Sequence, residues 1–89
     1  MTKLEAILEV DHNHFLDLLS IQHRYDGKKD ALIAALPEML SQPGVDQTEV
    51  CHRVARECSA IDKTRDEEMA SCQEKHNALI KGMQGLGGQ

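Results

Sequence analysis

Cysteine and histidine side chains that could bind a metal ion are concentrated between residues 51 and 76. Cys72 and His76 lie four residues apart, so a helix would place both on one face, as a pair of metal ligands requires. Cys51, His52 and Cys58 add further donors. A zinc site usually takes four converging ligands, whereas these donors are spread along a single helix. The pattern favours cysteines that act as small buried packing residues, and it predicts no metal site and no cofactor.

A second group of residues with catalytic chemistry lies in the first third of the chain. A histidine beside an aspartate can act as a general base whose ring is oriented by the carboxylate. The group consists of Asp11, His12, His14, Asp17, His23 and Asp26. The chain offers no nucleophile in a recognisable elbow and no glycine-rich phosphate loop. Solvated histidines on a polar face are the favoured interpretation, so we predict no enzyme activity and assign no catalytic residue.

The cysteines belong to a long helical pattern at about residues 46–83. Asp46 can cap the N-terminus of this helix, and Glu49 stands at the third position of a capping box. Val45 and Val50 occupy the two positions of a hydrophobic staple around that cap. The sequence therefore specifies where this helix begins.

One lane of this helix has seven-residue spacing. Cys51, Cys58, Cys72 and Leu79 occupy the lane, and Arg65 is its remaining member. The spacing predicts a seam with a period near 3.5 residues, as in a coiled coil. A charge in a seam is costly if it is buried without a partner. The Arg65 side chain is therefore expected either to extend out to solvent or to form a register-setting ion pair or a contact with another chain.

A first helix is expected at about residues 3–36. Thr2 and Glu5 can form a capping box at its start. Gly27 lies in its middle, where a kink would redirect the N-terminal end. Pro37 disfavours helical angles at the preceding residue, so the helix should end there. Its apolar stripe comprises Leu4, Ile7, Leu8, Phe15, Leu18, Leu19, Ile21, Tyr25, Leu32, Ile33, Leu36 and Met39.

These patterns predict an all-α fold, a long antiparallel two-helix hairpin that resembles a coiled coil. Residues 37–45 form a proline-containing connector between the helices. Residues 1–84 make a single domain, and residues 85–89 form a flexible glycine-rich tail.

Composition limits the range of functions. The net charge is −5, and acidic residues outnumber basic ones in both halves of the chain, which argues against nucleic acid as a partner. No apolar run approaches the roughly 20 residues that a transmembrane helix needs. The chain has one Phe, one Tyr and no Trp, so it can bury little surface by itself. We therefore expect other protein subunits to pack on the apolar stripe within a hetero-oligomeric complex.

Several short motifs, taken in order, resemble the caffeine-induced death protein family. They are FLDLLSIQHRYD at residues 15–26, GVDQTEVC at residues 44–51 and TRDEEMASC at residues 64–72, with the proline-containing connector between the first two. The chain resembles a shortened and divergent member of this family. The residues that carry the resemblance are Phe15, Leu18, Leu19, Arg24, Asp26, Pro37, Asp46, Cys51, Arg65, Asp66 and Cys72.

The resemblance implies a small coiled-coil protein of the mitochondrial intermembrane space or the periphery of a membrane complex. Its function would be that of a non-catalytic structural or assembly subunit in the respiratory chain or the protein-import machinery. An alternative rests on architecture alone: a small chaperone or needle-type subunit of a bacterial type III secretion system, in the bacterial cytoplasm. A third function, redox or metal sensing, would require thiols that react with or bind something.

Overall fold

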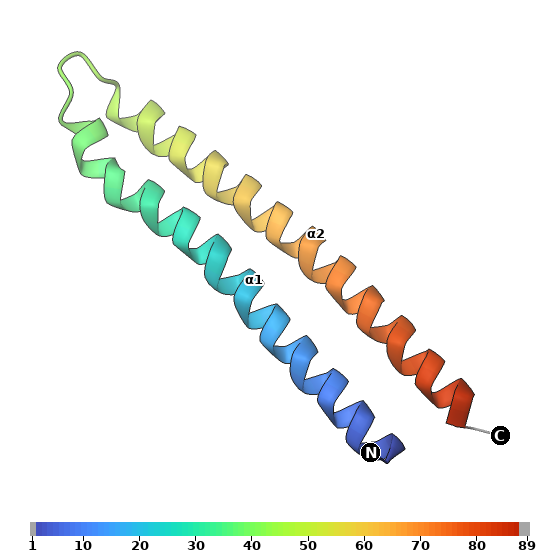
Figure 1. Ribbon diagram of the computed structural model, residues 1–89. Helices are drawn as coiled ribbons and strands as arrows, with labels where there is room; N and C mark the ends of the chain where they lie inside the picture. Colours follow the sequence, from blue (N-terminus) through green and yellow to red (C-terminus); the bar gives the residue numbers. More distant parts are fainter. Residues whose placement is uncertain (1, 88–89) are drawn as a thin grey trace.

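The computed structural model describes residues 2–87, which form two long α-helices joined by a short connection (Figure 1). Helix α1 spans Lys3–Leu40 and helix α2 spans Gln47–Gly87. The helices run antiparallel and side by side, so the beginning of α1 lies beside the end of α2. The Cα atoms extend over 70 × 17 × 9 Å, which makes the molecule a narrow rod. The expected all-α helical hairpin is confirmed.

Both helices begin at their predicted caps. Thr2 Oγ1 accepts a hydrogen bond from the backbone N–H of Glu5 at 3.1 Å, and Asp46 Oδ1 accepts one from the backbone N–H of Glu49 at 3.2 Å. Each cap satisfies a backbone donor that has no partner within the helix. Gly44 has a φ of 74°, a left-handed conformation that glycine adopts without steric cost, and it lies in the turn that reverses the chain.

Helix α1 continues through Pro37 to Leu40, so the predicted end at residue 36 is wrong. Pro37 lies in the last turn, where its missing N–H removes a single hydrogen bond near a helix end. Ser41 closes the helix: its N–H is directed at the carbonyl oxygens of Pro37 and Glu38, and its hydroxyl donates to the latter at 2.8 Å. The connector therefore covers residues 41–46, and α1 also passes Gly27 without interruption.

Helix α2 extends to Gly87, past the expected end at residue 83. Residues 85–87, which were expected in the tail, are thus helical. Glycine weakens a helix by about 1 kcal/mol relative to alanine but keeps its N–H donor, and no proline follows to end the helix. Residues 88 and 89 of the expected tail lie outside the described residues.

The seam between the helices repeats every eleven residues. Its residues follow steps of three and four in a 4-4-3 order, and all of them are buried or half-buried. On α2 they are Val50, Val54, Cys58, Ile61, Arg65, Met69, Cys72, His76, Ile80 and Met83. On α1 they are Ile7, Val10, His14, Leu18, Ile21, Tyr25, Lys29, Leu32, Leu36 and Leu40. An eleven-residue repeat corresponds to about 3.67 residues per turn.

The predicted seven-residue lane is therefore wrong at both ends. Cys58, Arg65 and Cys72 lie in the seam, but Cys51 is exposed and Leu79 is 57% exposed. On a straight helix a seven-residue lane drifts by about 20° per heptad, so it leaves the seam on either side of its centre. The two helices in Figure 1 run as nearly straight rods and do not wrap around each other.

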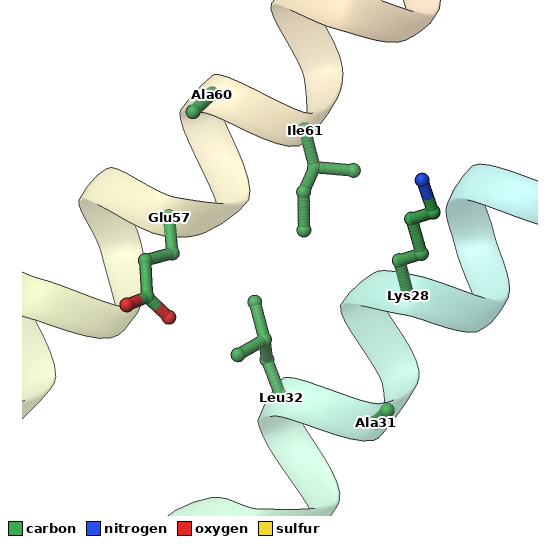
Figure 2. A pocket seen from close by; sticks show the side chains of 6 residues that line it. All are labelled: Lys28, Ala31, Leu32, Glu57, Ala60 and Ile61. Carbon is green, nitrogen blue, oxygen red and sulfur yellow. The ribbon is translucent and has the colours of Figure 1, made fainter.

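Packing in the seam is thin. Ile21, Tyr25, Val50 and Val54 are the buried apolar residues, and no side chain that the structure describes is fully buried. Figure 2 shows one layer of this packing, in which Leu32 of α1 and Ile61 of α2 point toward each other. So little burial indicates that the hairpin alone is only marginally stable.

Candidate functional site

Most of the exposed large apolar side chains of the described residues lie on the N-terminal half of α1. Four of them form a surface that we call the apolar face, which consists of Leu4, Leu8, Phe15 and Leu19, and these are 65%, 57%, 56% and 50% exposed. Their spacing of four, seven and four residues places them on one side of the helix. The helical pattern of the sequence groups them in one stripe with Leu18 and Ile21, but in the structure Leu18 and Ile21 enter the seam and the four residues do not. Clustered exposed apolar side chains of this kind mark interaction surfaces.

Charged side chains cross the middle of the seam. Lys29 Nζ donates to Asp62 Oδ1 at 2.9 Å, and the hydrogen bond lowers the pKa of Asp62. Arg24 and Tyr25 both donate to the carboxylate of Glu68. Both bonds lower the pKa of Glu68, and the bond from Tyr25 has the larger effect. The same bond to Glu68, together with burial, raises the pKa of Tyr25. Three residues of α1 are thereby tied to two carboxylates of α2.

Arg65 does not extend freely to solvent, and its ion pairs stay on its own helix. Arg65 Nη1 lies 3.3 Å from Asp62 Oδ1, the oxygen that also accepts from Lys29. Arg65 Nη2 lies 3.0 Å from Asp66 Oδ1, and this hydrogen bond raises the pKa of Arg65. The ion pair between Lys29 and Asp62 thus crosses the seam, and Arg65 supports it through its own ion pair with Asp62.

A polar cluster fills the seam near the open end of the hairpin. We call it the histidine cluster, and it consists of Asp11 and His14 from α1 and Cys72, Gln73 and His76 from α2. The two imidazole rings stack, with centroids 4.1 Å apart and planes at 19°. His76 Nε2 donates to Asp11 Oδ1 at 2.6 Å, while His76 Nδ1 is buried and has no hydrogen-bond partner.

The remaining bonds of the histidine cluster involve the ring of His14. Its Nδ1 lies 3.5 Å from Cys72 Sγ, and its Nε2 lies 3.0 Å from Gln73 Oε1. Gln73 Nε2 in turn donates to Asn77 Oδ1 at 2.9 Å. The ring of His14 is thus held on both nitrogens by residues of the other helix.

The residues singled out by the family resemblance do not converge on one site. Phe15 and Leu19 belong to the apolar face, and Leu18 lies in the seam. Others have separate local roles: Asp26 accepts from Gln22 Nε2 at 2.7 Å, Asp46 caps α2, Pro37 lies in the last turn of α1, and Cys51 is exposed. Arg24, Arg65, Asp66 and Cys72 take part in the contacts described above. All three cysteines are free.

The joint role of His14 and His76 was not predicted from the sequence. His14 was expected to be a solvated histidine, and His76 was weighed only as half of a metal pair with Cys72 on one helix. The eleven-residue spacing would have placed both in the seam, together with Lys29 and Arg65. Gln73 and Glu68 gave no such signal, because their importance depends on how the two helices are aligned.

Within residues 2–87, no group of three His, Cys, Asp or Glu side chains is arranged to hold a metal ion. Neither helix, over the part that the structure describes, has a stretch long and apolar enough to cross a membrane.

Comparisons with protein-family models, with curated proteins and with solved structures found no match for this chain.

Proposed function

We propose that this chain is a non-catalytic structural or assembly subunit that binds another protein through the apolar face of α1. The observation that carries the proposal is the exposure of Leu4, Leu8, Phe15 and Leu19 on one side of a helix whose other side already packs in the seam. Covering a large apolar side chain is worth about 1.5–3 kcal/mol, so four of them provide a substantial driving force for association. A partner would also stabilise a hairpin that buries little surface by itself.

The partner surface is expected to be an apolar helix or groove of a larger protein complex. Helix-in-groove recognition uses anchors at spacings of three, four and seven residues, and the apolar face offers anchors at four and seven. For the host complex, we propose the mitochondrial respiratory chain or the protein-import machinery. This finer assignment rests on the ordered motifs that resemble the caffeine-induced death protein family.

The test is the native size of the endogenous protein after gentle detergent extraction. On a native gel, the unmodified chain should migrate with a complex far larger than its own 9.9 kDa, and mass spectrometry of that band would name the host. The double variant Phe15→Asp, Leu19→Asp should release the chain to the size of the free protein, because burying two carboxylates in an apolar contact is costly.

Ile33→Asp is the matched control for the double variant. Ile33 is as exposed as Phe15, at 56%, and lies on the same helix, about 20 Å beyond Leu19. This variant should remain in the complex. Migration of the unmodified chain at the size of a monomer or dimer would contradict the proposal, and so would equal release by both variants.

A further inference from the structure

Cys72 differs from the other two cysteines in its surroundings. It is half-buried in the seam, and it is the cysteine that lies within hydrogen-bonding distance of an imidazole in the described part of the chain. Two adjoining hollows meet at Cys72 and share Asp17 and Lys75 as further lining residues. A reagent in either hollow would therefore meet the thiol.

The hydrogen bonds around His14 allow its ring proton to be assigned to one nitrogen. Gln73 Nε2 donates to Asn77, so Gln73 Oε1 faces His14 Nε2, and a carbonyl oxygen can only accept. The proton of a neutral His14 ring is therefore on Nε2. Nδ1 is then an acceptor, and the S–H of Cys72 donates to it across 3.5 Å.

This arrangement links a thiol, an imidazole base and an orienting amide in one chain of hydrogen bonds. The same chemical logic activates cysteine nucleophiles in enzymes, where the imidazole takes the thiol proton and an amide holds the ring in the correct tautomer. Here the ring of His14 is further fixed by stacking on His76, which Asp11 holds from α1. Both helices contribute, so the arrangement exists only in the folded hairpin.

We propose that Cys72 is a site of thiol–disulfide exchange, with His14 as its general base and Gln73 as a positioning residue. The proton moves from Cys72 Sγ to His14 Nδ1, and the thiolate attacks one sulfur of an incoming disulfide. The disulfide bond of the substrate breaks while a new S–S bond to Cys72 forms. The leaving thiolate takes the proton from His14, so the products are a mixed disulfide at Cys72 and one free thiol.

The substrate that fits best is a small charged disulfide of the peptide type, such as oxidised glutathione. The hollow at Val10, Asn13 and Leu79 has a volume of about 260 Å³, which admits one arm of a small disulfide and excludes a folded domain. Asp17 and Lys75 offer opposite charges beside the thiol, which match the ammonium and carboxylate groups of a peptide. The other ionisable groups that line the two hollows are His14 and His76 in the first, with Asp11 bonded to His76, and Arg24 and Glu68 in the second.

The test compares single-cysteine proteins. Cys51→Ala with Cys58→Ala leaves Cys72, and Cys51→Ala with Cys72→Ala leaves Cys58, which is also half-buried and serves as the matched control. Oxidised glutathione and dithiodipyridine are the probes, with rates followed by absorbance and the mixed disulfide identified by mass. At neutral pH we expect Cys72 to react about tenfold faster than Cys58, because an unassisted thiol is only a few per cent ionised there.

The dependence on His14 decides the outcome. His14→Gln in the Cys72 protein should lower the rate about tenfold near neutral pH, and the difference should disappear in alkaline solution, where thiols ionise without a base. Gln73→Ala, at an exposed position, should give a smaller loss with the same pH profile. Circular dichroism checks that each variant is folded. If the His14→Gln protein is not folded, the rate of the Gln73→Ala protein tests whether the ring of His14 assists Cys72.

Two results would overturn the proposal. One is a Cys72 that reacts no faster than Cys58 in the folded protein. The other is a Cys72 rate that stays unchanged in folded His14→Gln and Gln73→Ala proteins at all pH values. Because these measurements use the isolated chain, their outcome is independent of whether the apolar face binds a partner.

Discussion

At the level of single residues, the seam holds polar and charged groups where a helical hairpin ordinarily places Leu or Ile. His14, Lys29, Arg65 and His76 all occupy seam positions. Most of their polar atoms have partners, and His76 Nδ1 is the buried side-chain atom of the described residues that has none. A buried group without a partner costs about 1–3 kcal/mol, so His76 is expected to lower the stability of the hairpin.

Replacing His76 by leucine should stabilise the hairpin. The change removes the unpaired Nδ1 and fills the seam with apolar volume, and it loses the hydrogen bond to the exposed Asp11 carboxylate, which is worth less than about 1 kcal/mol at an exposed position. We expect a gain on the order of 1 kcal/mol in the free energy of unfolding, measured by urea titration. A loss of stability would show that the bond to Asp11 outweighs the unpaired nitrogen, and Asp11→Ala, which removes the acceptor, is the control that isolates that bond.

The cross-seam carboxylates should make stability depend on pH. The pKa values of Asp62 and Glu68 are lowered in the folded chain, so their stabilising effect is fully present above the unfolded values of 3.8 and 4.5. It is lost as the pH falls through the folded values. The melting temperature should therefore decrease as the pH falls from about 5 to about 2.

The variant Asp62→Asn, Glu68→Gln should flatten this acid-side decrease, whereas Glu67→Gln, at a neighbouring exposed position, should retain it. Thermal melts followed by circular dichroism would measure both. Equal slopes for the two variants would mean that other carboxylates control the acid response.

At the level of the elements, two glycines of the described chain have opposite roles. Gly27 lies in the middle of α1, and a β-carbon added there would meet nothing within 4 Å. Gly44 also has open space around it, but its φ of 74° is unfavourable for residues with a side chain. The same substitution is therefore predicted to change stability in opposite directions at the two positions.

Gly27→Ala should raise the free energy of unfolding by about 0.5–1 kcal/mol, because alanine has the higher helix propensity and loses less entropy on folding. Gly44→Ala should lower it by about 1 kcal/mol through backbone strain in the turn. Urea unfolding of the matched pair tests both predictions. A destabilising Gly27→Ala would show that α1 is not a continuous helix at this position.

At the level of the whole molecule, the hairpin is a thin rod with the connection between its helices at one end (Figure 1). The histidine cluster lies toward the opposite, open end. The Cα radius of gyration of the hairpin is 20.2 Å. A globular chain of this length would have a radius near 12 Å and an unfolded one near 30 Å. The eleven-residue seam fits this shape, because its period of about 3.67 residues lies close to the 3.6 of a straight helix and calls for only a slight right-handed supercoil.

Small-angle X-ray scattering of the dilute purified chain should therefore give a radius of gyration near the Cα value, with a cross-section of two helices. A radius close to the globular value would contradict the extended hairpin. A value near 20 Å with twice the expected mass would indicate side-by-side association of two hairpins, and the Phe15→Asp, Leu19→Asp variant would show whether the apolar face mediates it.

The sequence by itself determined the two helices and their reversal, because the signals are local. The caps at Thr2 and Asp46 and the turn at Gly44 involve residues within a few positions of one another. The tertiary structure decided which face of each helix enters the seam. Periods of 3.5 and 3.67 residues differ by only a few degrees per residue, and the difference accumulates over a long helix until Cys51 and Leu79 point away.

The apolar face and the histidine cluster both depend on which side of each helix enters the seam. Phe15 and Leu18 are both apolar and three residues apart, yet one is on the exposed apolar face and the other is in the seam. His14 and Cys72 meet across 58 positions of sequence, which no local pattern specifies. Contacts of this kind arise from the alignment of two rods, so only the packed hairpin brings these residues together.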